Sequence, residues 1–195
     1  MGLHFMKDVP FENVYVHALV RDEKGQKMSK SKGNVIDPLT IINEYGADAL
    51  RFTLISMSSP GRDVKLSIDR VKGYRNFLTK IWNTFNYCKL NNVFKLKKIN
   101  LSKIENPANQ WIIKTLNDYK KKVKNNIENY RFDESAKNLY LYIWNYFCDW
   151  YIEFSKPLLQ SNNKKVVEET RNILLYLQIE NLSLLHPFIP FITEE

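Results

Sequence analysis

The apolar positions beyond residue 61 recur at helical spacing, and this pattern predicts a protein that is mainly α-helical. Hydrophobic residues three and four positions apart form stripes, with polar residues between them. The segments with this pattern span residues 67–90, 107–129, 133–156 and 164–185, and a polar, lysine-bearing connector occupies 91–105. Because most connections are short, successive helices are expected to run antiparallel and to pack as a bundle.

Residues that start and stop helices support these boundaries. Ser67 can cap a helix N-terminus, and Asn106-Pro107 places a capping side chain before a proline in the first turn. Asp133 is expected to begin the third helix. Pro157 is expected to end the third helix, because proline lacks the backbone N–H that a helix needs.

The apolar stripes define the expected core of the bundle. The inward positions are Val71, Tyr74, Leu78, Ile81, Phe85 and Cys88 on the first helix, Trp111 or Ile112, Leu116, Tyr119, Val123 and Ile127 on the second, and Tyr140, Trp144, Phe147, Trp150, Tyr151 and Phe154 on the third. We interpret the aromatic residues of the third helix as core packing, since inward rings dominate core energetics. A platform that stacks on bases is the alternative.

The first part of the chain has a different pattern. Residues 13–20 are apolar and rich in β-branched side chains, and they predict a buried strand. Asp37-Pro38 predicts the start of a short helix that ends at Gly46, and residues 47–57 predict a second one. The turn that follows is the expected domain boundary. The fold class is therefore an antiparallel helical bundle, 61–195, preceded by a short α/β segment, 1–60.

The positive charge is concentrated in the middle of the chain. Residues 65–131 carry 16 basic and 4 acidic side chains, whereas residues 1–64 are neutral and residues 132–195 are acidic. A local basic excess of this kind is typical of a surface that binds a polyanion, and a solvated lysine-rich face is the alternative. Lys120, Lys121 and Lys124 are the candidate phosphate contacts.

The cysteines and the hydropathy exclude several classes of protein. Cys88 and Cys148 lie far apart within apolar segments, so we expect buried free thiols and neither a disulfide framework nor a metal site. No apolar run approaches the roughly 18 residues of a membrane span, and the N-terminus lacks the pattern of a signal peptide. A cytoplasmic protein without membrane contact is expected.

One short stretch, residues 27–34, concentrates the candidate chemistry. It carries three lysines in six residues, separated by two serines and followed by Gly33-Asn34. Lysines at this spacing cannot share one face of a helix or strand, so a loop is predicted. Ammonium and hydroxyl groups together suit a polyphosphate, and a solvated surface turn is the alternative.

The order of residues in this stretch resembles a known signature. Lys27 to Ser31 reads Lys-Met-Ser-Lys-Ser, which is similar to the second signature of class I aminoacyl-tRNA synthetases. Gly46 to Phe52 is similar to a segment of the valine, isoleucine and leucine enzymes. Residues 59–63 and 73–83 resemble the valyl-tRNA synthetases in particular, and residues 186–195 resemble the point where the family's helical bundle is completed. Ala18 stands where that family usually has glycine.

This resemblance implies an ATP-dependent ligase, in which an amino-acid carboxylate attacks the α-phosphate of ATP. It implies that Lys30 binds ATP and that Lys27 assists catalysis. It also implies that Ser29 and Ser31 steady the phosphates, while Met28 anchors the loop. Mg²⁺ is expected with ATP, with no metal ligand from this chain.

The resemblance also implies that the bundle binds the anticodon of tRNA(Val). Asn76, Lys80, Asn83 and Tyr87 recur along one stripe of the first expected helix, with Arg75 close by. Amides and an ammonium can contact base edges, and a tyrosine can stack on an unpaired base. An ordinary solvated face is the alternative. A monomer is expected.

One signature of the family is not found in this sequence. Class I synthetases need a first signature of the His-Ile-Gly-His type, and none of His4, His17 and His186 has that context. We therefore expect part of a longer enzyme that is inactive alone. The alternatives are a stand-alone RNA-binding helical module, the corresponding part of an isoleucyl- or leucyl-tRNA synthetase, or an unrelated nucleotidyltransferase.

Overall fold

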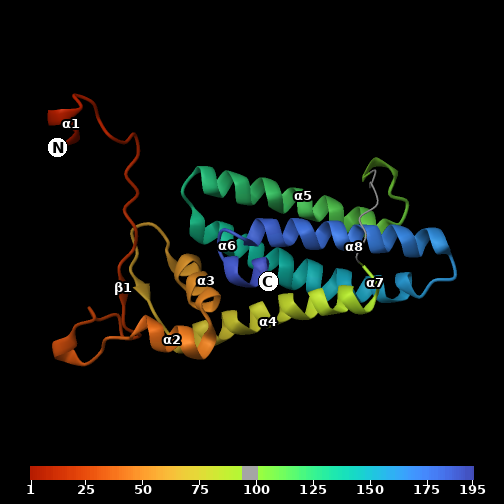
Figure 1. The fold of residues 1–195 in the computed structure, drawn as a ribbon, viewed down its shortest axis with the longest axis horizontal. Helices are drawn as coiled ribbons and strands as arrows, with labels where there is room; N and C mark the ends of the chain where they lie inside the picture. The colour runs from red at the N-terminus through yellow and green to blue at the C-terminus, as the bar shows by residue number, and fades with distance from the viewer. Residues whose placement is uncertain (94–100) are drawn as a thin grey trace.

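The computed structural model describes residues 1–93 and 101–195, and four long antiparallel helices form its main body (Figure 1). They are α4 (Ile68–Leu90), α5 (Pro107–Glu128), a continuous helix made of α6 (Phe132–Leu141), η3 (Tyr142–Tyr151) and α7 (Ile152–Leu159), and α8 (Lys164–Leu185). The prediction of a helical bundle is confirmed. Residues 94–100 of the expected connector lie outside the described residues.

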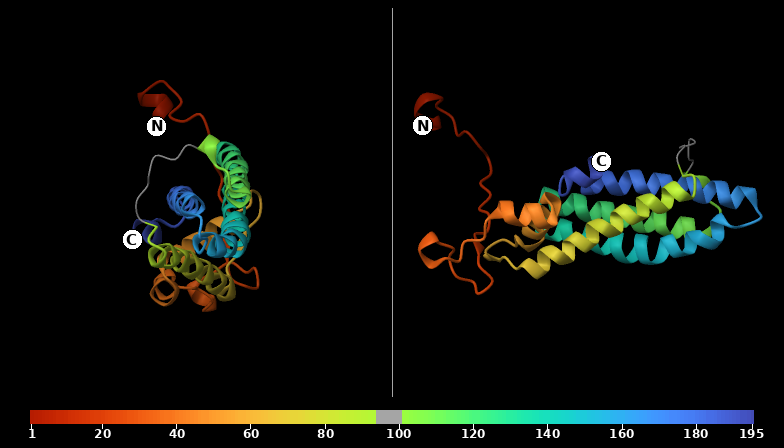
Figure 2. Two further views of the ribbon diagram at one scale, coloured as in Figure 1. Left: turned by 90° about the vertical axis from the view of Figure 1, so that its right-hand side faces the viewer. Right: turned by 60° about the horizontal axis from the view of Figure 1, so that its bottom comes forward.

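Most of the shorter elements lie on the side of the bundle where α4 begins (Figure 1). They are α1 (Gly2–Phe5), β1 (Val20–Arg21), the 3₁₀ turn η1 (Lys30–Lys32), α2 (Pro38–Tyr45), α3 (Ala47–Met57), β2 (Val64–Lys65) and α9 (Pro190–Glu194). A second 3₁₀ turn, η2 (Leu101–Lys103), lies between α4 and α5. The further views show α2 and α3 against the bundle and the N-terminal segment extending away from it (Figure 2).

The helix starts follow from side-chain caps that the sequence predicts. Asp37 accepts a hydrogen bond from the backbone N–H of Leu39 at 2.9 Å, and Asn106 accepts one from Ala108 at 3.0 Å. Asn163 caps α8 in the same way, although only the start of that helix, and not its cap, is predicted from the sequence. Each cap satisfies a backbone donor that has no partner inside its helix. These local interactions explain why the predicted starts are correct.

One hydrophobic core runs through the bundle and includes α3. The largest side chains that are fully buried are Phe52, Phe77, Tyr142, Phe147 and Tyr151. The ring of Phe52, on α3, lies 5.3 Å from that of Phe77, on α4. The rings of Phe147 and Tyr151 confirm that the aromatic helix packs into the core.

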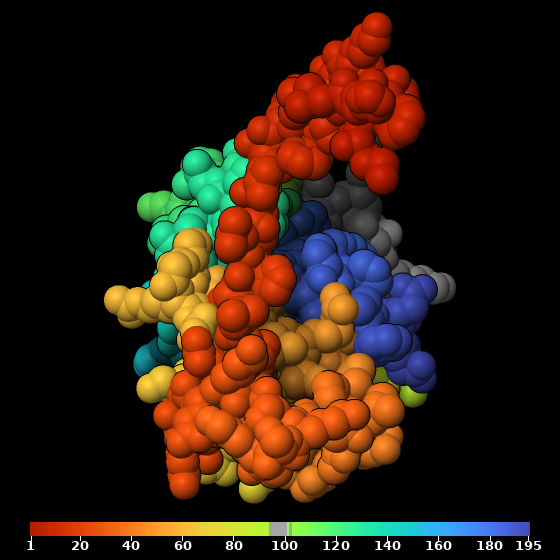
Figure 3. All heavy atoms as spheres, turned by 90° about the vertical axis from the view of Figure 1, so that its left-hand side faces the viewer, coloured from red at the N-terminus to blue at the C-terminus, as the bar shows by residue number. Residues whose placement is uncertain are grey.

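The predicted buried strand over residues 13–20 is wrong. Only Val20 and Arg21 form a strand, which pairs in parallel with Val64 and Lys65 of β2. The residues before it are mostly exposed, with Val16 80% accessible. A buried strand needs neighbours on both edges, and β2 pairs with two residues only. Figure 3 shows the N-terminal segment as a narrow strip over this end of the molecule.

Two expectations about helix ends also need correction. Ser67 precedes α4 as expected, but its hydroxyl donates to Glu23 at 3.1 Å and does not cap the helix. Pro157 lies inside α7, which ends at Leu159. A proline in the last turn removes only one hydrogen bond, and the backbone N–H of Gln160 still reaches back to the helix.

Four residues assigned to the core lie at the surface. Phe85 and Ile127 are each 40% exposed, Phe154 is 42% exposed and Trp150 is 57% exposed. Trp150 and Phe154 lie within and just after η3, which is a π-helix. Its wider turn rotates the residues that follow, so a stripe drawn at α-helical spacing misplaces them.

Candidate functional site

The lysine-rich loop leads from β1 into the 3₁₀ turn η1. Gly33 ends this turn with φ at 65°, a left-handed conformation that glycine adopts without strain. Lys27 and Lys30 are exposed, and among the described residues no carboxylate pairs with either ammonium group. The hydroxyls of Ser29 and Ser31 lie 3.3 Å apart. The loop therefore presents free cations beside two hydroxyl groups.

Asn34 holds this loop in shape. Its side-chain oxygen accepts a hydrogen bond from the backbone N–H of Ser29 at 3.0 Å. Its side-chain nitrogen donates to Asp22 at 2.8 Å and to the backbone carbonyl of Lys27 at 3.3 Å. The bond from Asn34, together with the one from the backbone N–H of Gln26, holds the pKa of Asp22 below its ordinary value.

Two further contacts fix the start of the loop to the rest of the molecule. Arg21, in β1, forms an ion pair with Asp63, and this contact lowers the pKa of the carboxyl group. Glu23 accepts the hydrogen bond from Ser67 at the start of α4. The lysine loop is thus attached to the bundle through β1, β2 and the first turn of α4.

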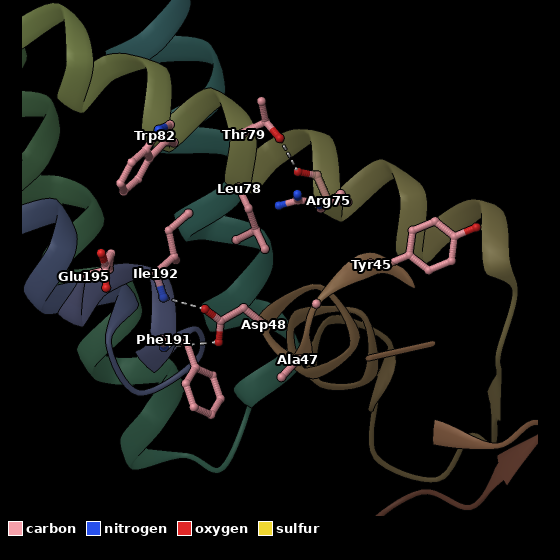
Figure 4. A pocket seen from close by; sticks show the side chains of 11 residues that line it. Tyr45, Ala47, Asp48, Arg75, Leu78, Thr79, Trp82, Phe191, Ile192 and Glu195 are labelled. Atoms are coloured by element: carbon pink, nitrogen blue, oxygen red, sulfur yellow. Dashed lines mark hydrogen bonds between the residues drawn. The ribbon is translucent and has the colours of Figure 1, made fainter. Parts of the chain in front are cut away.

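The predicted RNA-binding residues divide between two sides of α4. Arg75 lines a pocket of about 480 Å³ with Trp82 and Phe191, where α3, α4 and α9 meet (Figure 4). Asn76 and Asn83 are exposed, whereas Lys80 is partly covered by η3. The structure therefore keeps the stripe of Asn76, Lys80 and Asn83 together but separates Arg75 from Lys80, five residues away.

Tyr87, the last residue of the stripe, is half-buried. Its hydroxyl lies 2.8 Å from that of Ser155, on α7. Burial raises the pKa of Tyr87. Its ring is therefore less free to stack on a base than the sequence suggests, and its role in RNA binding stays a prediction.

The three candidate phosphate lysines of α5 differ in their surroundings. Lys120 forms an ion pair with Glu180 of α8 at 2.6 Å. Lys124 lies 3.8 Å from Glu128, in an exposed pair that screens little of its charge. Lys121 is exposed, and no described residue forms an ion pair with it. Lys121 is therefore the lysine of this group that is free to contact a phosphate.

Sequence reasoning missed three residues that shape the two candidate sites. Asn34 organises the loop, although the Gly33-Asn34 pair signalled only a turn. Trp144 and Asp149 both contact Lys80. The sequence did not indicate this, because Trp144 and Asp149 are five residues apart and would not share a face of an α-helix. Only the π-helical turn places the carboxylate of Asp149 on the face toward Lys80, and the sequence carried no signal for that turn.

The structure also bears on the classes of protein that composition excludes. Cys88 and Cys148 are both buried and free, as the sequence predicts, and burial raises the pKa of each thiol to about 12. Within residues 1–93 and 101–195, no helix combines the length and the apolar character that a membrane span requires.

Two family models match separate parts of the chain. The model for class I tRNA synthetases of the isoleucine, leucine, methionine and valine types matches residues 1–67. The model for the anticodon-binding domain of tRNA ligases matches residues 109–195. The first match contains the lysine-rich loop, and the second contains most of the bundle.

Curated relatives match the whole chain. A valine–tRNA ligase of Pelagibacter ubique is 55% identical over 194 residues, and one of Bradyrhizobium diazoefficiens is 52% identical over 195 residues. The valine–tRNA ligase of Bartonella quintana is also 52% identical. The chain spans 20–22% of the length of these relatives.

Solved structures share the fold. The LeuRS of Agrobacterium radiobacter K84, in a ternary complex with tRNA and LeuAMS, superposes with a TM-score of 0.78 over 98% of this chain and 23% of its own, at 24% identity. Mycobacterium tuberculosis methionyl-tRNA synthetase, in complex with methionyl-adenylate, superposes with a TM-score of 0.70 over 91% of this chain and 36% of its own, at 17% identity. The chain thus belongs to the class I tRNA synthetases, within the valine–tRNA ligase family.

Proposed function

We propose that this chain forms part of an ATP-dependent valine–tRNA ligase, in which it supplies the loop that binds the ATP phosphates and the face that binds the anticodon of tRNA(Val). The observation that supports it most directly is the lysine loop, whose ammonium groups are exposed and whose backbone is held by Asn34. Its sequence stands within a segment that matches class I tRNA synthetases.

The chemistry of the reaction explains why such a loop is useful. The carboxylate of valine attacks the α-phosphorus of ATP, a bond forms between them, and the bond to pyrophosphate breaks. Negative charge grows on the phosphate oxygens, so ammonium groups already in place lower the barrier. In this proposal Lys30 contacts the phosphates, Lys27 assists it, and Ser29 and Ser31 donate hydrogen bonds, while Met28 anchors the loop.

The second half of the proposal concerns tRNA. Asn76 and Asn83 are exposed on one stripe of α4, with the partly covered Lys80 between them, and Lys121 adds a free cation on α5. Amide and ammonium groups can contact the edges of unpaired bases, whereas a free lysine suits a phosphate. Base contacts depend on sequence and phosphate contacts do not, so the two classes of residue can be separated experimentally.

We also propose the remaining features of the complete enzyme. Mg²⁺ accompanies ATP, because magnesium usually binds to substrate phosphates and keeps several of its waters. The enzyme acts as a monomer in the cytoplasm, and sedimentation of the complete enzyme tests the monomer.

Binding of tRNA to the 195-residue chain tests the RNA half of the proposal. We expect tighter binding of a transcript with the valine anticodon than of the same transcript with a different anticodon. Asn83→Ala should reduce this preference by about tenfold, and Lys121→Ala should weaken both complexes alike and flatten their salt dependence. Lys137→Ala, which removes a charge on α6, is the control. Equal affinity of the unmodified chain for both transcripts would contradict the proposal.

A further inference from the structure

Lys80 is held between two side chains of the π-helix η3. Its ammonium group lies 4.1 Å from the centre of the Trp144 ring and donates a hydrogen bond to one carboxylate oxygen of Asp149. Trp144 is itself stacked on Tyr140, with the ring centres 5.5 Å apart and the planes at 20°. A cation that lies over an aromatic ring and beside a carboxylate has little freedom to move.

The π-helical turn is the reason that both side chains reach Lys80. Trp144 and Asp149 are five residues apart, and in an α-helix they would point about 140° away from each other. In a π-helix each hydrogen bond spans five residues, as the bond from the backbone N–H of Ile152 to the carbonyl of Phe147 shows. Residues five apart then lie nearly above one another, on the side that faces α4.

This arrangement changes what Lys80 can bind. One of the three N–H groups of the ammonium donates a hydrogen bond to Asp149 Oδ1, and the other N–H groups are left to donate to a ligand. No residue in the described part of the chain donates to Asp149 Oδ2. The pair therefore presents a donor next to an acceptor, and its net charge is zero. A phosphate offers acceptors only and is repelled by the carboxylate, whereas the edge of an unpaired base offers an acceptor beside a donor.

We propose that Asp149 is a specificity-determining residue of the RNA-binding face. It prevents Lys80 from serving as a general phosphate contact and makes the Lys80–Asp149 pair a reader of an unpaired base, while Trp144 positions the ammonium group. The inference rests on the proposed binding of tRNA by this face. It assigns to η3, a helix outside the α4 stripe, a direct part in discriminating between RNAs.

Asp149→Asn tests this inference, because asparagine keeps the shape of the side chain and removes its charge. The matched control is Glu153→Gln. Glu153 lies four residues after Asp149 and forms an exposed ion pair with Lys156, so its substitution makes the same charge change away from Lys80. Affinity for the cognate transcript and for the anticodon-changed transcript is measured for both variants over a range of salt concentrations. Thermal unfolding by circular dichroism checks that each variant is folded.

We expect the Asp149→Asn variant to bind the anticodon-changed transcript more tightly, so that discrimination between the two transcripts falls by about tenfold. The slope of log affinity against log salt concentration should become steeper by about one, because Lys80 is then free to contact a phosphate. The control should leave discrimination unchanged. In a Lys80→Met background, Asp149→Asn should have no further effect on discrimination, because Asp149 acts through Lys80. Equal changes in discrimination for the Asp149 and Glu153 variants would overturn the inference. An undiminished effect of Asp149→Asn in the Lys80→Met background would overturn it as well. If the unmodified chain shows no discrimination, it is the proposed function that fails.

Discussion

The carboxylate of Asp48 accepts a hydrogen bond of 2.7 Å from the backbone N–H of Ile192, which lies 144 residues further along the chain (Figure 4). The neighbouring N–H of Phe191 donates to the same carboxylate at 3.4 Å. One turn further along α3, the guanidinium group of Arg51 donates to the backbone carbonyls of Pro187 and Phe188 at 3.2 Å each. Two charged side chains of α3 therefore hold the C-terminal segment on the bundle.

This contact leads to a prediction about stability. Asp48→Ala should lower the free energy of unfolding by about 1–3 kcal/mol. It removes a buried carboxylate and leaves the backbone N–H groups of Phe191 and Ile192 without their acceptor. Urea unfolding of the purified chain measures the effect. Asp69→Ala is the control, since the side chain of Asp69 is 88% exposed. Equal stabilities of the two variants would show that the anchor contributes nothing.

A second network joins the turn after α3 to the start of α6. Asp133 is fully buried, accepts a hydrogen bond from Ser59 at 2.8 Å and pairs with Arg131 at 3.1 Å. Burial alone would raise the pKa of Asp133. The hydrogen bonds from Arg131 and Ser59 outweigh burial and hold the pKa below the ordinary value of 3.8.

The direction of this shift predicts how stability depends on pH. Folding favours the charged form of Asp133, so its contribution is fully present above the pKa of the unfolded chain, near 4, and is lost as the pH falls through the folded pKa. Asp133→Asn should cost about 1–3 kcal/mol at pH 7 and less as the pH approaches 2.5. Urea unfolding from pH 7 to 2.5 measures this difference. The exposed Asp118→Asn variant should show no such trend, and a penalty independent of pH would contradict the assignment.

The shape of the lysine loop gives a third prediction. Asn34→Ala removes three hydrogen bonds, to Ser29, Lys27 and Asp22, and should therefore open the loop more often. Trypsin should then cleave within residues 27–32 about five to ten times faster. Mass spectrometry identifies the cleavage sites and measures the rates.

The control for this experiment is Gln26→Ala, since Gln26 contacts Asp22 through its backbone. Its cleavage rate should stay close to that of the unmodified chain. If Asn34→Ala is cleaved no faster than this control, the hydrogen bonds of Asn34 do not limit the opening of the loop.

The features that the sequence predicted correctly are those that depend on neighbouring residues. Asp37 and Asn106 cap helices whose first turns lie immediately after them, and Gly46 ends α2 with φ at 90°. Residues 27–34 also form a loop with a 3₁₀ turn, as their order predicts, and the binding of phosphate by this loop stays a prediction. In each case, the residues that determine the conformation lie within one or two turns of each other.

The features that the sequence did not predict depend on distant partners or on an unusual turn. Residues 13–20 have the composition of a strand, but Val16 is exposed because the short β2 reaches only Val20 and Arg21. The contact of Asp48 with Ile192 joins residues that lie 144 positions apart. The pairing of Lys80 with Asp149 requires a π-helix, which periodicity at 3.6 residues per turn cannot reveal.

The position of the domain boundary stays a prediction, and the packing of α3 suggests how to test it. Phe52 contacts Phe77 and Phe188, with ring centres 5.3 and 6.4 Å apart. We therefore propose that the folding unit begins at α2. Residues 37–195 should unfold cooperatively in urea, and residues 67–195 should be less stable by several kcal/mol, because removal of α3 exposes these rings. Equal stability of the two chains would place the boundary after α3.

The last prediction concerns Lys30 in a complete valine–tRNA ligase that carries this segment. Lys30→Ala should lower the rate of valine-dependent ATP–pyrophosphate exchange by about 10²–10³-fold, the usual effect of removing one group that stabilises charge in a transition state. The loss should persist at saturating ATP, because the ammonium group acts mainly on charge that develops during the reaction. Lys24→Ala, which removes an exposed lysine from the preceding turn, should have little effect. A rate restored fully by high ATP would show that Lys30 contributes only to ground-state binding.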